Sequence, residues 1–243
     1  MKHTFIKIVL LFIALSSSSC FKINQKLNPQ MRKIVGSQKV IDDIRPLNDF
    51  HSIQIEWSVG EIFLVQDTIN QIRLNGEDNI LPEIHDTVIN GVLTLFNSAY
   101  TMIRYNDAVT VYVHFKNIDE IISDQGTYKT IGKIKTTHLN VKSNLCDFEL
   151  NLEADTLNAE ISGNGKCHSS LTAKGFVNYS NITLTMSGVF DSPELKGNYC
   201  YINFEENCCY HIKVRNFSHT NILIPTNCIN IPNFWRLKEL IEE

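Results

Sequence analysis

A strict alternation of apolar and polar residues governs most of this 243-residue chain and limits the folds open to it. The segment 109–115 shows the pattern clearly, since Val109, Val111, Val113 and Phe115 take every second position. Successive side chains of an extended strand point to opposite faces, so a period of two is typical of strands with one buried face. Neighbouring segments follow the same rule, and the sequence therefore predicts an all-β protein.

Turn residues separate the strands predicted in the N-terminal half. Asn90-Gly91 stands between two alternating segments, and both central residues of a two-residue hairpin turn need a positive φ, which Asn and Gly tolerate. Asn75-Gly76 and Pro82 mark further turns. These positions predict an antiparallel strand region in this half of the chain.

From Gly132 onward the strands shorten and a loose repeat begins. Its units start 18, 20, 18 and 16 residues apart, and each contains two short strands and small turn residues. The starts are His138, Thr156, Phe176, Glu194 and Tyr210. A strand-rich period near twenty favours a β-solenoid, in which each turn buries its face by stacking on its neighbours. A β-sandwich with evenly spaced strands is the alternative.

Residues 231–243 carry apolar side chains at helical spacing, including Phe234, Leu237 and Leu240, with Asn233 as an N-cap. A solenoid needs its ends covered, so we expect a short C-terminal helix packed over the last coil. A partner-binding helix is the alternative interpretation of the same pattern.

The N-terminus has the pattern of an export signal. Residues 1–19 have a basic start, an apolar run too short to span a bilayer, and then small residues. The run ends at Cys20, as in bacterial lipoprotein signals, whose cysteine is diacylated after cleavage. Ser17 stands where such signals usually have leucine, so secretion without a lipid is the alternative. Residues 20–44 are polar and predict a flexible tether.

Several short motifs follow one another along the chain: Asp49-Phe50, Gly60, the run Gly76–Asn79, Gly91, and the glycine turns at 161–165 and 186–190. In these motifs the chain resembles the GIN domain, the auto-transporter adhesin head domain found mainly in exported proteins of Bacteroidetes. The resemblance implies a right-handed β-helix-like fold over residues 45–230 and an adhesive role. This chain has fewer glycine turns than the family pattern, which implies a less regular solenoid.

Glu77 and Asp78 begin an acidic run that also includes His85 and Asp86. Calcium could use such carboxylates, but the spacing of calcium-binding loops is absent. We therefore expect a turn whose polar side chains bond nearby backbone, followed by outward strand residues, and we predict no metal site.

A polysaccharide-acting enzyme on a pectin-lyase-like β-helix would need carboxylates stacked one rung apart. The chain has a dense acidic set at Asp147, Glu149, Glu153, Asp155 and Glu160, but no acids at matching places in the next repeat. It also lacks a nucleophile motif and a phosphate-binding glycine loop. We predict no catalytic residue and no cofactor.

Six cysteines follow Cys20. Cys146 and Cys167, like Cys209 and Cys228, are about one solenoid turn apart, and strands in adjacent turns are close enough for a disulfide. We therefore predict two disulfides that join neighbouring rungs. Buried free thiols that act as small core residues are an equal alternative.

Taken together, these features predict a non-catalytic lipoprotein of the cell envelope, at the outer membrane or facing the periplasm. Its partners would be the membrane, through the lipid on Cys20, and a glycan or a protein. A net charge of −4 without a basic cluster argues against nucleic acid. The alternatives are the polysaccharide-acting enzyme and an accessory or sensor subunit of an envelope complex.

Overall fold

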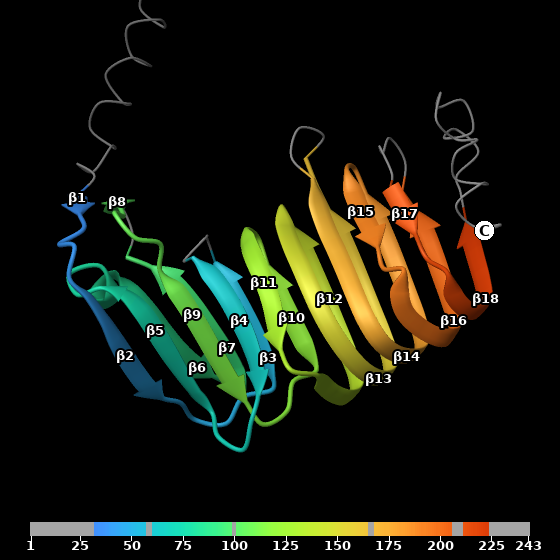
Figure 1. The fold of residues 1–243 in the computed structure, drawn as a ribbon, viewed down its shortest axis with the longest axis horizontal. Helices are drawn as coiled ribbons and strands as arrows, with labels where there is room; N and C mark the ends of the chain where they lie inside the picture. The colour runs from blue at the N-terminus through green and yellow to red at the C-terminus, as the bar shows by residue number, and fades with distance from the viewer. Residues whose placement is uncertain (1–31, 57–59, 99–100, 165–167, 206–210, 224–243) are drawn as a thin grey trace, which may run out of the picture.

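The computed structural model describes residues 32–56, 60–98, 101–164, 168–205 and 211–223. These residues form strands β1 to β18 and one short 3₁₀ helix, η1, and they wind into a β-solenoid of about four turns (Figure 1). The predicted all-β solenoid is therefore confirmed. The predicted C-terminal helix over 231–243 lies outside the described residues.

The N-terminal half holds β1 (Arg32–Val35), β2 (Val40–Pro46), β3 (Ser52–Glu56), β4 (Glu61–Gln66), β5 (Gln71–Glu77), η1 (Leu81–Glu83), β6 (Ile84–Ile89), β7 (Val92–Asn97), β8 (Thr101–Arg104) and β9 (Thr110–Phe115). The solenoid continues with β10 (Glu120–Ser123), β11 (Gly126–Ile131), β12 (Ile134–Asn144), β13 (Cys146–Ser162), β14 (Ser169–Thr185), β15 (Gly188–Asp191), β16 (Glu194–Phe204), β17 (His211–Lys213) and β18 (Asn216–Leu223). Strand β1 and the first part of β2 lie within the range 20–44 predicted as a tether, so among the described residues the chain is part of the sheets from Arg32 onward.

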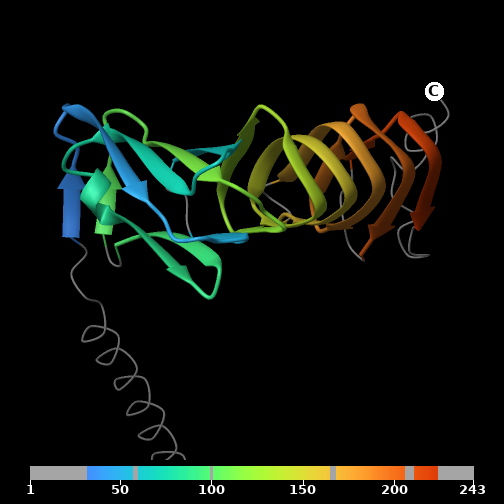
Figure 2. The same cartoon turned by 90° about the horizontal axis from the view of Figure 1, so that it is seen from below.

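The strands form two walls. The first wall runs β2-β5-β9-β4-β11, continues with the first halves of β13 and β14, and ends with β15 and β17. The second wall runs β6-β7-β3-β10-β12, continues with the last halves of β13 and β14, and ends with β16 and β18. Seen from below, the ribbons of the later strands curve from one wall into the other (Figure 2).

Long bent strands replace the pairs of short strands expected from the sequence. Strands β13 and β14 have 17 residues each and pair in parallel along both walls. The pairing is interrupted at a corner, where Asp155 has no ladder partner. Pairing with both neighbouring strands resumes at Thr156, so the strand passes the corner without a separate turn.

Rows of inward side chains from the two walls form the core. The first wall contributes Ile62, Tyr128, Phe148, Leu171 and Phe190 in register, each at most 1% exposed. The second wall contributes Ile53, Ile121, Val141, Ala159 and Ile182. The rings of Tyr128 and Phe148 stack with centroids 4.5 Å apart. The Tyr128 hydroxyl bonds the Ser123 hydroxyl, and burial raises the pKa of Tyr128.

The N-terminal strand region contains the predicted antiparallel pairs, but β3–β7 and β4–β9 pair in parallel. Asn75-Gly76, predicted as a turn, lies within β5. Strands β2 and β9 both pair antiparallel with β5, and β6 pairs antiparallel with β7. The β6–β7 turn has Asn90 at φ 52° and Gly91 at φ 77°, the positive values that the dipeptide predicts.

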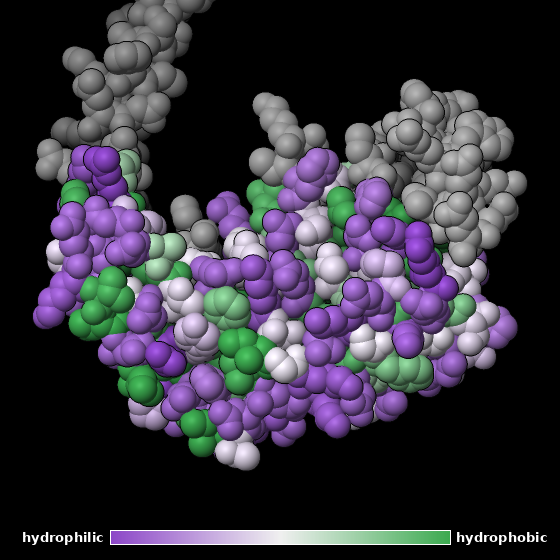
Figure 3. All heavy atoms as spheres, viewed as in Figure 1, coloured by the Kyte–Doolittle hydropathy of each residue, from purple (hydrophilic) through white to green (hydrophobic). Residues whose placement is uncertain are grey.

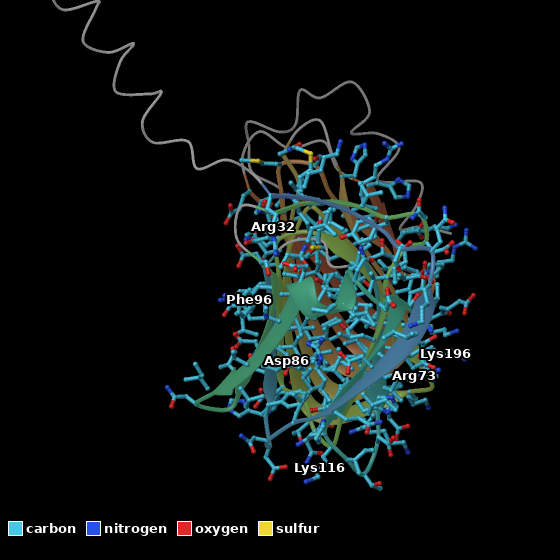
Figure 4. All side chains as sticks on the ribbon, turned by 90° about the vertical axis from the view of Figure 1, so that its left-hand side faces the viewer. Arg32, Arg73, Asp86, Phe96, Lys116 and Lys196 are labelled. Atoms are coloured by element: carbon cyan, nitrogen blue, oxygen red, sulfur yellow. The ribbon has the colours of Figure 1, made fainter. Side chains whose placement is uncertain are left out.

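Arg45 on β2 joins the two walls at this end of the solenoid. Its guanidinium donates to the carbonyl oxygens of Ile84 at 2.7 Å and Leu81 at 3.1 Å, and it pairs with Asp86 at 2.7 Å. A view along the solenoid from this end shows Arg73 and Phe96 on opposite sides (Figure 4). Arg45 therefore connects β2 of the first wall with η1 and β6 of the second wall.

Replacing Phe148 with alanine is expected to lower the free energy of unfolding by about 3–5 kcal/mol, because the change leaves a cavity beside Tyr128. Urea denaturation followed by circular dichroism measures the difference. Asn203→Ala, at an exposed position on β16, is the control and should change stability by less than about 0.5 kcal/mol. A loss at Phe148 no larger than at Asn203 would contradict the assigned core.

Candidate functional site

Glu77, in the acidic run, is a buried structural clamp. Its carboxylate is 0% exposed and accepts the backbone N–H of Gln38 at 2.7 Å, the backbone N–H of Asn106 at 3.0 Å, and the Asn106 amide at 2.8 Å. A Cβ added to Gly36 would lie 1.9 Å from the same carboxylate, so only glycine fits there. Glu77 thereby ties the segment between β1 and β2 to the β8–β9 loop.

The rest of the acidic run also serves the fold. The Ser37 hydroxyl donates to Asp78 at 2.6 Å, and Asn79 donates to the carbonyl of Val35 at 2.8 Å. Asp78 also accepts the backbone N–H of Asn79, as predicted for this turn. The sequence pattern did not indicate the further contacts of Asp78 and Asn79 with the N-terminal segment. The carboxylate oxygens of Glu77 are already occupied by N–H donors, so the clamp offers no calcium site.

His85 and Asp86 are half-buried, and both have partners. Asp86 pairs with Arg45, while His85 lies 2.7 Å from the Ser98 hydroxyl and packs against the ring of Phe96. The sequence predicted outward strand residues at these two positions. Asp86 instead has a structural role, because it forms the ion pair with Arg45 at the N-terminal end of the solenoid.

An exposed grid of side chains on the second wall is the strongest candidate for a binding surface. We call this surface the ladder face. It consists of the outward-pointing residues in the last halves of β12, β13, β14, β16 and β18. One of its columns is an amide ladder, in which Asn181 donates to Asn158 at 2.8 Å and Asn158 donates to Asn140 at 2.9 Å. Each amide keeps hydrogen-bonding capacity that the ladder does not use.

A stack of rings runs beside the amide ladder. Tyr179 and Tyr199 are parallel with centroids 5.0 Å apart, and His219 continues the stack 5.1 Å from Tyr199. Register places these three residues on successive rungs. Because the rings cover one another's faces, they present mainly their edges and polar atoms to solvent.

The amide ladder lines a shallow hollow of about 450 Å³, which we call the ladder hollow. Lys142, Glu160 and Thr183 form its far side. Amides beside a lysine, a glutamate and a threonine offer many donors and acceptors on a rigid sheet. Such a surface suits a long polar ligand rather than an apolar one.

The acidic residues of β13 are spread around the rung. Asp147 and Glu149 lie on the first wall, and Glu160 lies on the second. Their partners on β14 are Ser170, Thr172 and Thr183, so no acid is stacked on an acid there. This arrangement agrees with the prediction of no stacked carboxylate cluster.

Glu153 comes nearest to a carboxylate with a basic residue on an adjacent rung. Lys133 at 3.1 Å and Lys135 at 3.5 Å hold it, and the hydrogen bond from Lys133 leads the interactions that lower the pKa of Glu153. A general acid in glycoside hydrolysis needs a raised pKa. Glu153 is therefore suited to an ion pair rather than to proton donation.

Cys146 and Cys200 are the cysteines within the described residues, and both are buried. The Cys146 thiol donates to Ser123 Oγ at 3.3 Å, and burial raises the pKa of Cys200 to about 12. Cys167, Cys209 and Cys228 lie outside the described residues. The cross-rung disulfides thus stay predictions.

Apolar residues do not gather into one large patch on the face drawn in Figure 3, where small hydrophobic groups are separated by hydrophilic ones. A sensor or accessory subunit would be expected to expose a single apolar patch. In the part of the chain that the structure covers, no helix is long and apolar enough to cross a membrane.

The sequence contained an unused signal for the amide ladder. Asn140, Asn158 and Asn181 each stand one residue before an inward apolar residue of a repeat unit. Aligning the repeats on those apolar residues would have placed the asparagines in one column. The ring stack had a weaker signal, because Tyr179 and Tyr199 are ordinary strand residues.

The family model described as "Putative auto-transporter adhesin, head GIN domain" matches residues 49–205. Among solved structures, a "putative adhesin" from Bacteroides fragilis NCTC 9343 is similar with a TM-score of 0.54 and 16% identity. A "putative lipid binding protein" from Parabacteroides distasonis ATCC 8503 has a TM-score of 0.54 and 10% identity. Each similarity covers 79% of this chain and 100% of the other. These two similarities show a shared fold. Among curated proteins, none matches the sequence.

Glu77→Gln is expected to lower the melting temperature at pH 7, because an amide cannot accept from all the N–H donors of the clamp. The Asn106 amide leads the hydrogen bonds that hold the pKa of Glu77 low. The ionised Glu77 carboxylate therefore contributes fully to the stability of the fold above its unfolded pKa of about 4.3. This contribution is lost as the pH falls through the lower pKa of the folded state. Melting curves from pH 7 to pH 3 should converge for the two proteins.

Glu160→Gln, at an exposed position, is the control and should melt like the wild type at every pH. Calcium chloride should leave the melting temperature of the wild type unchanged. A rise with calcium that Glu77→Gln abolishes would show a metal site instead of a clamp.

Proposed function

Because this chain belongs to the GIN domain family of auto-transporter adhesin heads, we propose that it is a non-catalytic adhesion module of the cell envelope whose ladder face binds glycan chains. The family membership supports an extracellular or envelope-associated protein. A protein ligand is the other candidate for the same face.

The observation that carries the proposal is the amide ladder of Asn140, Asn158 and Asn181 beside the stacked edges of Tyr179 and Tyr199. Strands of one sheet lie about 4.8 Å apart, so the ladder repeats donors and acceptors at a short, regular interval. A glycan is also a repeating array of hydroxyl donors and acceptors. Regular spacing on a rigid sheet lets several weak hydrogen bonds form together without ordering loops.

The protein is proposed to attach to the membrane through a diacylated Cys20. The residues between Cys20 and Arg32 span at most about 40 Å when fully extended, so an anchored chain would keep the solenoid close to the bilayer. The lipid would hold the protein at the membrane surface without a spanning helix. Secretion of an unlipidated chain is the alternative.

Asn181→Ala is expected to weaken glycan binding about tenfold, because it removes one amide of the ladder. Binding is measured on an array of neutral and acidic oligosaccharides and then by calorimetry with the strongest array binder. Thr172→Ala is a matched control, since it alters an exposed residue of the same strand on the first wall and should leave affinity unchanged. Absence of binding to every glycan would refute the proposal and turn attention to protein ligands.

The intact mass of protein from its native membrane fraction is expected to match a chain that begins at a diacylated Cys20. A mass without lipid would contradict the anchor. Peptide mapping of the same sample without reduction shows whether Cys146 pairs with Cys167 and Cys209 with Cys228. Free thiols at these positions would contradict the predicted disulfides.

A further inference from the structure

A groove of about 680 Å³ lies at the corner between the two walls, and we call it the corner groove. Its lining includes His51, Asp119, Lys135, His138, Asp155 and Phe176. These residues come from the N-terminal strand region and from β12, β13 and β14. A volume of this size suits a small ring-shaped ligand or one end of a larger one.

Phe176 differs from the aromatic residues of the ladder face. Tyr179 is 42% exposed and its ring stacks on Tyr199, whereas Phe176 is 46% exposed and its register neighbours are the non-aromatic Glu153 and Lys196. Within the described residues, no ring stacks on it. About half of this side chain is therefore accessible, and it lines the groove.

Asp155 supplies the matching polar group. It is exposed at the corner and has no ladder partner, and its carboxylate makes no hydrogen bond or ion pair with any described residue. The other charged groups here are largely satisfied, since Glu153 pairs with Lys135 and His51 lies 3.1 Å from Asp119. An unpaired carboxylate can accept hydrogen bonds from ligand hydroxyl groups.

The corner groove leads directly into the ladder hollow. Asp119 lines the first and the next residue, Glu120, lines the second. On β12, His138 lines the groove and Asn140 lines the hollow, two positions further along the same side of the strand. A ligand lying along β12 would therefore pass from one hollow to the other.

Resting on the proposed glycan-binding function, we propose that the corner groove is a subsite for an uncharged sugar ring, with Phe176 as its platform and Asp155 as its hydroxyl acceptor. The C–H face of a pyranose ring packs against the negative face of the phenyl ring, while its rim of hydroxyls reaches the carboxylate. Lys135 also lines the groove but pairs with Glu153, and His51 lies beside Asp119, so the carboxylate of Asp155 is the charge without a partner among the described residues. That negative charge disfavours uronates and other anionic sugars.

The first test is the oligosaccharide array, where wild-type protein should bind uncharged glycans and not uronate-bearing ones. Binding confined to uronates would overturn the proposal. Calorimetry with the strongest uncharged binder then compares variants. Phe176→Ala should weaken affinity about tenfold and Asp155→Asn by a smaller factor, while Phe176→Trp should retain binding.

Ile131→Ala is the matched control, because Ile131 is also 46% exposed but lies on the first wall away from the groove. Thermal melts check that every variant folds. Wild-type affinity in both Phe176→Ala and Asp155→Asn would overturn the subsite. If Asn181→Ala still weakened binding in that case, the ladder face would stand without the subsite; if it did not, both proposals would fail.

Discussion

The structure depends on the parallel, in-register stacking of rungs. Each strand of the solenoid obtains its backbone hydrogen bonds from the rungs on either side, so no rung satisfies its own polar groups. The same register aligns like with like: Phe148 packs on Tyr128 inside, while Asn158 bonds Asn140 outside. A shift of one residue would move every apolar side chain to the solvent face, so the buried rows fix the outer columns as well.

Stacking leaves the ends of the solenoid as its weak points, and polar groups close the N-terminal end. Arg45 holds carbonyl oxygens of η1 and β6, and the buried carboxylate of Glu77 holds N–H groups of two loops. Elsewhere in the solenoid, backbone groups are hydrogen-bonded by the next rung. At this end the side chains of Arg45 and Glu77 supply hydrogen bonds to backbone groups instead. The acidic run of the sequence is thus explained by the architecture rather than by chemistry on a ligand.

The outer surface follows from the same repetition. A column of identical residues satisfies part of its own hydrogen-bonding capacity and covers its own ring faces, as the Tyr179–Tyr199 stack does. A side chain whose neighbours on the adjacent rungs are of a different kind keeps its hydrogen-bonding groups or ring free to contact a ligand. Phe176 and Asp155 are such side chains: Asp155 lies where the ladder pairing is interrupted, and Phe176 lines the same groove. This contrast separates a rigid adhesive face from a subsite that can select a ring.

The sequence by itself determined the strands, the antiparallel pairs of the N-terminal region and the solenoid, because a period of two, an Asn-Gly turn and a repeat near twenty are local patterns. It also contained the family motifs from Asp49 to Gly91. Only the tertiary structure decided that short strands fuse into the bent β13 and β14, that Glu77 and Asp86 are structural, and that Phe176 and Asp155 share a groove. Those outcomes depend on which residues meet across rungs of 18 to 23 residues, and local sequence does not encode that register.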